Sequence, residues 1–193
     1  MIIILRRIWL FNGGEALPSD KQVKELLPFI GWDKVTLQNN RITLAPGMEL
    51  DFGGLGKEYA VDKSMQIANR VTSSPVLINF GGDICANKAL HSGKPWQVGI
   101  DHPGFKDKQP VVIKISAIAT SGDACRFIIN DGIRYSHVLN PKTGLALSDA
   151  PKSVTVTAPT CIQAGFIATL ALLQGDRAED FLNQQHIGHW CIR

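Results

Sequence analysis

Four short motifs, each with a tight backbone segment beside a polar side chain, interrupt the apolar runs of this 193-residue chain. They occupy residues 51–62, 79–83, 119–123 and 136–144. Three of them contain glycines close to a predicted strand or helix end, where the backbone turns sharply and its N–H groups can approach an anion. Together, in this order, the motifs indicate a site for a large ligand that carries phosphate groups.

The composition excludes several classes of protein. A hydrophobic content of 45% and a charged content of 19% are ordinary for a soluble globular domain. The net charge of +3 and the absence of a basic run longer than Arg6-Arg7 exclude a nucleic-acid-binding role. No apolar run is long enough for a membrane span, and the N-terminus lacks a signal-peptide pattern, so a cytoplasmic location is expected.

Four cysteines lie far apart without a CxxC pair, which argues against a zinc knuckle or a redox dithiol. Free buried thiols in a reducing compartment are the expectation.

Apolar periodicity predicts the secondary structure. The expected helices are 20–29, 57–70, 161–174 and 178–184. The expected strands are 34–37, 41–44, 76–80, 96–100, 111–115, 116–120, 127–129, 133–135 and 153–157, after a strand-like run at the N-terminus. This pattern predicts one α+β domain over residues 1–193, with a mixed, largely antiparallel sheet and packed helices.

Each motif taken alone has two interpretations. The glycines of residues 53–56 precede a helix, and they either admit an anion or form a structural turn. Asp83 either accepts hydrogen bonds from a ligand or belongs to a β-turn with an Asx bond. Thr120 and Ser121 either hold a phosphate or ribose at a strand end or form a turn capped by Asp123. His137 is either a packed residue or a ligand-binding one.

In combination the four motifs resemble those of the FAD:protein FMN transferases, the ApbE-like family. The resemblance runs from about Trp9 to about Gly175, and its most specific parts are 51–62 and 136–144. It implies FAD and a divalent cation, usually Mg²⁺, as cofactors. It also implies the transfer of FMN from FAD to a Thr or Ser hydroxyl of a target protein with release of AMP, a phosphoryl transfer.

The resemblance assigns roles to particular residues. Asp51 and Lys57 are expected against FAD. The carbonyl of Gly54 and the hydroxyl of Thr169 are expected on the metal. His137 and Leu139 are expected to line the nucleotide. The other expected cofactor-binding residues are Gly82, Asp83, Thr120, Ser121, Gly122, Thr143 and Gly144, and the expected catalytic residues are Lys57, His137 and Asp123.

The chain departs from the family pattern at several positions. Gly165 stands where the family has an Asp that binds the metal, so metal binding should weaken, because Mg²⁺ is usually held by one or two carboxylates. Glu58 replaces a glycine, and it could repel FAD, point to solvent or substitute as a metal ligand. Asn140 replaces an Asp. An N-terminal segment that contributes to the flavin pocket in the family is expected to be absent.

Three hypotheses follow. The first is an active transferase with altered metal ligation, whose partners are FAD and a target protein or flavoprotein subunit. The second is a degenerate module that binds FAD or another adenine nucleotide without chemistry. The third is an interaction protein, for which exposed strand edges would favour a homo-oligomer.

Overall fold

The computed structural model describes residues 4–11, 16–100, 109–123 and 126–193. The chain divides into two compact units. The first unit comprises Met1–Phe52 and Cys125–Asp149, and the second comprises Gly53–Ala124 and Ala150–Arg193. The α+β class and the largely antiparallel sheet are confirmed, since every pairing between named strands in the described ranges is antiparallel. The single domain over residues 1–193 stays a prediction.

In the first unit, the N-terminal apolar run forms a 3₁₀ helix, η1 (Ile4–Arg7), so the predicted strand-like conformation is wrong. Ile4 and Leu5 are adjacent in the sequence, and both are buried in one core. A strand would send their side chains to opposite faces. A helical turn lets both reach the core, and the backbone N–H of Trp9 closes it by donating to the carbonyl of Leu5 at 2.9 Å.

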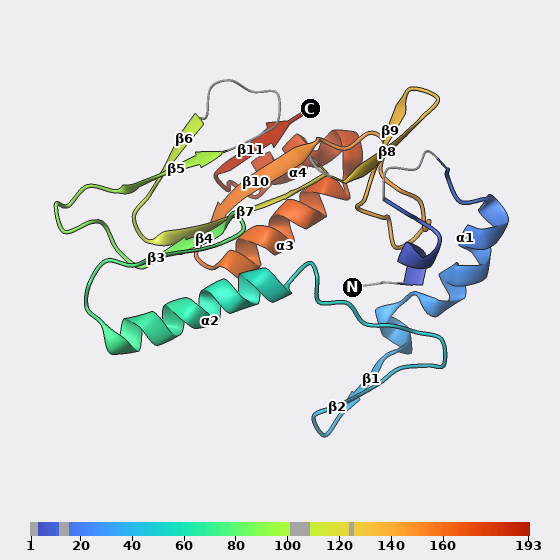
Figure 1. The fold of residues 1–193 in the computed structure, drawn as a ribbon, viewed down its shortest axis with the longest axis horizontal. Coiled ribbons are helices and arrows are strands. Elements are labelled where there is room, and N and C mark those ends of the chain that lie inside the picture. Colours follow the sequence, from blue (N-terminus) through green and yellow to red (C-terminus); the bar gives the residue numbers. More distant parts are fainter. Residues whose placement is uncertain (1–3, 12–15, 101–108, 124–125) are drawn as a thin grey trace. The chain divides into compact units, whose positions relative to one another are not determined.

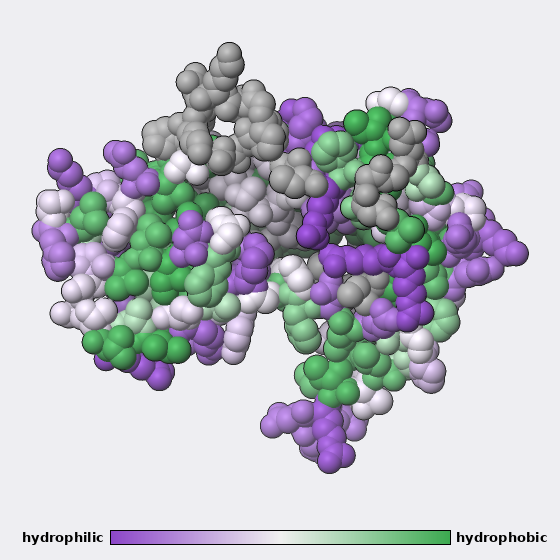
Figure 2. Space-filling view, viewed as in Figure 1, coloured by the Kyte–Doolittle hydropathy of each residue, from purple (hydrophilic) through white to green (hydrophobic). Residues whose placement is uncertain are grey.

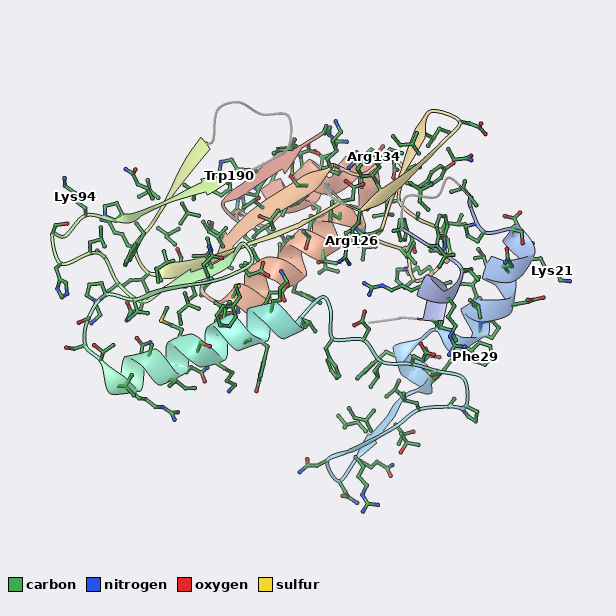
Figure 3. The ribbon with its side chains drawn as sticks, viewed as in Figure 1. Lys21, Phe29, Lys94, Arg126, Arg134 and Trp190 are labelled. Atoms are coloured by element: carbon green, nitrogen blue, oxygen red, sulfur yellow. The ribbon has the colours of Figure 1, made fainter. Side chains whose placement is uncertain are left out.

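The first predicted helix begins where its capping residues indicate. The Ser19 side chain accepts a hydrogen bond from the backbone N–H of Gln22, and the Gln22 side chain accepts one from the backbone N–H of Ser19. This capping box starts α1 (Asp20–Leu26). The 3₁₀ helix η2 (Leu27–Phe29) continues to the predicted end, and Lys21 extends outward from α1 (Figure 3).

Both predicted hairpins of the first unit are confirmed. β1 (Thr36–Gln38) pairs with β2 (Arg41–Thr43), and β8 (Phe127–Asn130) pairs with β9 (Ile133–Ser136). Two-residue type I′ turns require positive φ angles, which are found at Asn39, Asn40, Asp131 and Gly132. Figure 2 shows that the tip of the β1–β2 hairpin is hydrophilic, with hydrophobic residues nearer its base.

The core of the first unit surrounds Trp9. Its ring packs with the side chains of Ile30 and Ile128, and its Nε1–H donates to the carbonyl of Gly144 at 2.9 Å. The hydrogen bond from Trp9 to Gly144 satisfies the indole N–H inside the core and ties the N-terminal segment to the last motif. A further 3₁₀ helix, η3 (Trp32–Lys34), follows Ile30.

A five-stranded antiparallel sheet forms the centre of the second unit (Figure 1). Its strands follow the order β11 (His189–Ile192), β10 (Ser153–Ala158), β7 (Ser116–Gly122), β4 (Asp83–Ala86) and β3 (Leu77–Phe80). Strands β4 and β11 were not among the predicted strands. The sequence does not indicate β4, because its first residue, Asp83, directly follows two glycines, a pattern typical of a loop.

Two helices lie on one face of this sheet (Figure 1). α3 (Cys161–Leu172) packs on β7 and β10, while α2 (Gly56–Val71) packs on β3, β4 and α3. Thr160 caps α3 by accepting a hydrogen bond from the backbone N–H of Gln163 at 3.2 Å. The predicted helices at 57–70 and 161–174 are therefore confirmed, and both bring motif residues to the sheet.

The other face of the sheet is covered by a hairpin of β5 (Trp96–Ile100) and β6 (Gln109–Ile113). Trp190, labelled in Figure 3, packs against the same hydrophobic core from β11. The 3₁₀ helix η4 (Gly175–Arg177) leads into α4 (Ala178–Gln184), which packs against α3 and confirms the last predicted helix.

Candidate functional site

The N-terminus of α2 supplies a positive electrostatic end inside the first motif. No side-chain hydrogen bond caps this helix at Leu55, and a Cβ added at Gly56 would meet no atom within 4 Å. The first backbone N–H groups of a helix lack partners within the helix and attract anions. The glycine-rich entrance to α2 therefore offers both the space and the charge that a phosphate requires.

An ion pair joins the first motif to the second. The ammonium group of Lys57, in the first turn of α2, contacts the carboxylate of Asp83 at the start of β4. Asp83 is buried, whereas the side chain of Lys57 is half exposed. An ammonium group has three N–H donors, so the pair orients Lys57 and leaves it donors for an anionic ligand.

The turn before Asp83 is a two-residue hairpin loop. Gly81 and Gly82 have φ angles of +61° and +96°, and the backbone N–H of Gly82 donates to the side chain of Asn79 at 2.9 Å. The alternative interpretation of this motif, a β-turn with an Asx bond, thus describes its backbone correctly. The same turn places Asp83 against Lys57, so the turn also serves the candidate site.

Glu58 follows Lys57 and is buried, with 7% of its surface exposed. Its Oε2 atom has no hydrogen-bond partner. Burial raises the pKa of the Glu58 carboxyl above its ordinary value, and the nearby negative charge of Asp83 acts in the same direction, while a hydrogen bond with its own backbone opposes them. The carboxylate lies over Gly165, because a Cβ built there would come within 2.8 Å of its Oε1 atom. Of the three alternatives for Glu58, the one in which its side chain points to solvent is wrong.

The third motif lies within strand β7 and does not follow it, so its interpretation as a turn after the strand is wrong. The Ser121 hydroxyl is 2.8 Å from that of Thr169 on α3. The Thr120 hydroxyl is 2.8 Å from that of Thr155 on β10. Successive side chains of a strand point to opposite faces, so the structure brings Ser121 and Thr169 together and separates the Thr120 side chain from them.

Gly122 and Asp123 close this strand. A Cβ at Gly122 would come within 2.7 Å of the Ser153 Cα, so glycine is required here for the close approach of β10. Asp123 is buried, and its backbone N–H donates to the carbonyl of Lys152 at 2.9 Å. The predicted cofactor contact of Gly122 and the predicted catalytic role of Asp123 stay predictions.

The first unit holds the remaining site residues. Asp51 lies 3.5 Å from the guanidinium of Arg6. His137 is half-buried, its ring meets that of Phe11 edge-on at 6.3 Å, and its backbone N–H donates to the carbonyl of Arg126 at 3.2 Å. Figure 3 labels Arg126 beside the start of β8. His137 therefore has a packed ring, as its structural interpretation expected.

The loop at 140–144 is organised by its own hydrogen bonds. The side-chain oxygen of Asn140 accepts a hydrogen bond from the backbone N–H of Lys142 at 2.9 Å. The backbone carbonyl of Asn140 accepts one from the backbone N–H of Gly144 at 2.8 Å. Thr143 is exposed, and its hydroxyl accepts from the backbone N–H of Leu145 at 3.3 Å. An Asx turn needs only a side-chain carbonyl oxygen, so Asn140 serves the loop without the charge of an Asp.

Leu139 and Gly144 are bound into the first unit's core. Leu139 packs against the hydrophobic cluster around Trp9 and forms a β-bridge with Ala146. Gly144 is buried, with a φ of +72°. Both residues hold the loop in place, and their predicted contacts with the nucleotide stay predictions.

The described residues limit the kind of site that they can form. Within the described ranges, no three His, Cys, Asp or Glu side chains gather as a metal-binding group. In the same part of the chain, no helix is both long and apolar enough to cross a membrane. Any cation bound by the described residues therefore has to combine fewer side chains of these types with hydroxyl, carbonyl or ligand oxygens.

Solved structures share this fold. The ApbE protein of Thermotoga maritima superposes with a TM-score of 0.84 at 27% identity, over 97% of this chain and 64% of that one. The flavin transferase ApbE of Vibrio cholerae superposes with a TM-score of 0.80 at 25% identity, over 97% of this chain and 62% of that one. The α+β architecture is therefore that of the ApbE proteins.

The sequence comparisons agree. The model of the ApbE family matches residues 2–191, and the chain belongs to this family. An FAD:protein FMN transferase of Haemophilus influenzae is 29% identical over 92% of this chain and 54% of its own length. One of Chlamydia pneumoniae is 30% identical over 95% of this chain and 60% of its own length. The chain thus spans about half of the length of the curated relatives it matches.

Proposed function

We propose that this chain catalyses the transfer of FMN from FAD to a Thr or Ser hydroxyl of a target protein, with release of AMP. The observation that carries the proposal is the contact between Lys57 and buried Asp83, which joins two glycine motifs at the N-terminus of α2, where Leu55 provides no side-chain cap. The relatives named FAD:protein FMN transferase support it.

In this reaction the oxygen of the target hydroxyl forms a bond to the phosphorus of the FMN moiety. The bond from that phosphorus to the bridging oxygen breaks, and AMP leaves with the oxygen. The proton of the target hydroxyl passes to a base. Positioning and charge neutralisation supply most of the catalysis in such transfers.

Residues of the second unit suit the charge neutralisation. Lys57 and the N-terminus of α2 would attract the negatively charged pyrophosphate. Asp83 would keep the Lys57 ammonium in place, since the two groups are in contact. Lys57 is therefore the residue whose loss should affect FAD most directly.

His137 of the first unit is one candidate for the base that accepts the proton, and Asp123 of the second unit is the other candidate. Imidazole and carboxylate side chains are common general bases. Asp51, Leu139, Thr143 and Gly144 are proposed to shape the nucleotide site in the first unit. These roles rest on the family resemblance and on the positions of the residues within their motifs.

A divalent cation, expected to be Mg²⁺, would neutralise further charge on the pyrophosphate. Hard cations bind oxygen donors, and the Thr169 hydroxyl and the unpartnered Glu58 oxygen are donors of this kind. The Gly54 carbonyl is the third proposed donor. A cytoplasmic location, a target protein or flavoprotein subunit as partner, and a homo-oligomer stay predictions.

Flavin fluorescence with and without excess Mg²⁺, followed by chromatographic detection of AMP, tests this function. The proposal expects FAD binding that strengthens with Mg²⁺, and AMP together with covalent flavin on an added target that carries Thr or Ser. Binding without Mg²⁺ dependence and without AMP would instead identify a nucleotide-binding module. The absence of FAD binding would leave the interaction protein as the supported alternative.

A further inference from the structure

We propose that Glu58 of α2 is the carboxylate of a divalent-cation site, and that Gly165 of α3 is the vacated position that makes room for it. The proposal rests on the function above, and it assigns a ligand that the resemblance places on the other helix. It begins from the burial of Glu58, an acidic residue with 7% of its surface exposed and one oxygen, Oε2, without a hydrogen-bond partner.

The Glu58 side chain lies in the space next to Gly165. A Cβ at Gly165 would lie 2.8 Å from Glu58 Oε1, 2.9 Å from Cγ and 3.2 Å from Cδ. Any side chain at position 165 would therefore have to occupy the space that the Glu58 carboxylate fills. A side chain at position 165 would displace the Glu58 carboxylate, so the place that Glu58 takes here depends on a small residue at 165.

Thr169 of α3 can supply a further oxygen donor. Gly165 and Thr169 lie one turn apart on the same face of α3, and helical side chains lean toward the N-terminal turn. The Thr169 hydroxyl, 2.8 Å from that of Ser121, is therefore an oxygen donor one helical turn from Gly165, the residue that the Glu58 carboxylate lies over. Mg²⁺ is usually bound by one or two carboxylates together with phosphate oxygens of the substrate, so Glu58 would supply the carboxylate and Thr169 a further oxygen.

The charges around Glu58 also favour a cation. Asp83 and Asp62 both add negative potential at Glu58, and Lys57 is the cation that opposes them. Lys57 is engaged by Asp83, while both oxygens of Asp62 accept backbone hydrogen bonds from α3. A buried carboxylate that lacks its own counter-charge is costly, and a divalent cation would supply that charge.

Manganese binding tests the proposal directly, because Mn²⁺ can be counted by electron paramagnetic resonance without any turnover. The isosteric Glu58→Gln variant removes the charge and should weaken Mn²⁺ binding at least tenfold. Glu25→Gln, at an exposed position on α1, is the matched control and should leave binding unchanged. Circular dichroism would verify that each variant is folded.

A charge exchange provides the second test. Gly165→Asp alone forces two carboxylates into one space, so its melting temperature should fall below that of the wild type. Combining it with Glu58→Ala should restore the melting temperature, because substitutions of residues in contact are not additive. The double variant should also bind Mn²⁺ with an affinity within about fivefold of that of the wild type. A double variant that binds no better than Glu58→Gln would contradict the exchange.

The inference is overturned if the wild type binds no Mn²⁺, or if Glu58→Gln binds it as tightly as the wild type does. Suppose that Glu58→Gln loses Mn²⁺ binding while the wild type releases no AMP from FAD. This pair of results would support the cation site and reject the transferase. If Glu58→Gln releases AMP and binds Mn²⁺ as the wild type does, the transferase would be supported and Glu58 would be rejected as a cation ligand.

Discussion

Asp62 of α2 caps α3 at Cys161. Its carboxylate accepts hydrogen bonds from the backbone N–H groups of Cys161 and Ile162, at 2.8 and 3.0 Å. These groups belong to the unpartnered first turn of a helix, where a negative charge is also favoured by the helix dipole. One side chain thus fixes α2 to α3, the two helices that carry Lys57, Glu58, Gly165 and Thr169.

Replacing Asp62 by alanine should therefore destabilise the chain. The loss of two charge-assisted hydrogen bonds at a helix N-terminus should lower the free energy of unfolding by about 2–3 kcal/mol. Urea denaturation measures the change. Asp180→Ala, at an exposed position on α4, is the control and should change stability by less than about 0.5 kcal/mol. Equal midpoints for the two variants would show that the cap contributes nothing.

Gly144→Ala should be more destabilising than Gly132→Ala. Both glycines have positive φ, +72° and +76°. A Cβ at Gly132 would meet no atom within 4 Å, whereas one at Gly144 would lie 2.7 Å from the Cγ1 atom of Val23. Backbone strain alone should cost about 1 kcal/mol, and the clash should add about 1–3 kcal/mol. Thermal unfolding of the two variants separates the terms, and similar losses would refute the steric contribution.

Lys57→Met should weaken FAD binding at least tenfold, because it removes the ammonium group proposed to face the pyrophosphate. It also leaves buried Asp83 without the cation that it contacts, so the melting temperature should fall as well. Lys63→Met, at an exposed position on the same helix, is the control. Flavin fluorescence titrations measure both variants. If the two bind FAD equally well, Lys57 is not a ligand of the cofactor.

Stability should fall as the pH rises above 9, partly through Cys85. Burial raises the pKa of this thiol from its ordinary value of 9.0 to about 11, with the charge of Asp62 adding to the effect. Between these pH values the unfolded chain loses the proton and the folded chain keeps it. The contribution is therefore fully present below pH 9 and is lost as the pH approaches 11.

The full effect is on the order of 3 kcal/mol, because the shift from 9.0 to about 11 spans two pKa units and each unit corresponds to about 1.4 kcal/mol. Cys85→Ala removes the titrating group. The urea midpoint should therefore fall less between pH 8 and pH 10.5 in the variant than it does in the wild type. An identical loss of stability in both proteins would show that Cys85 does not contribute.

The sequence predicted the features whose causes lie within a few residues. Ser19 and Gln22 mark the start of α1, because a capping box needs only those neighbours. The turns at 39–40 and 131–132 appear where residues that tolerate positive φ separate two strands. The family match likewise follows from local motifs, which keep their order along the chain.

The sequence by itself determined the α+β class, most of the helices and hairpins and the family. Tertiary structure decided how the motif side chains are used. The register of β7 against β10 and the side-chain alternation of the strand put Ser121 and Thr120 on opposite faces. The packing of α2 on α3 placed the Glu58 carboxylate in the space beside Gly165. These outcomes depend on residues about 30 to 100 positions apart, whose steric and electrostatic contacts exist only once the sheet and helices have packed.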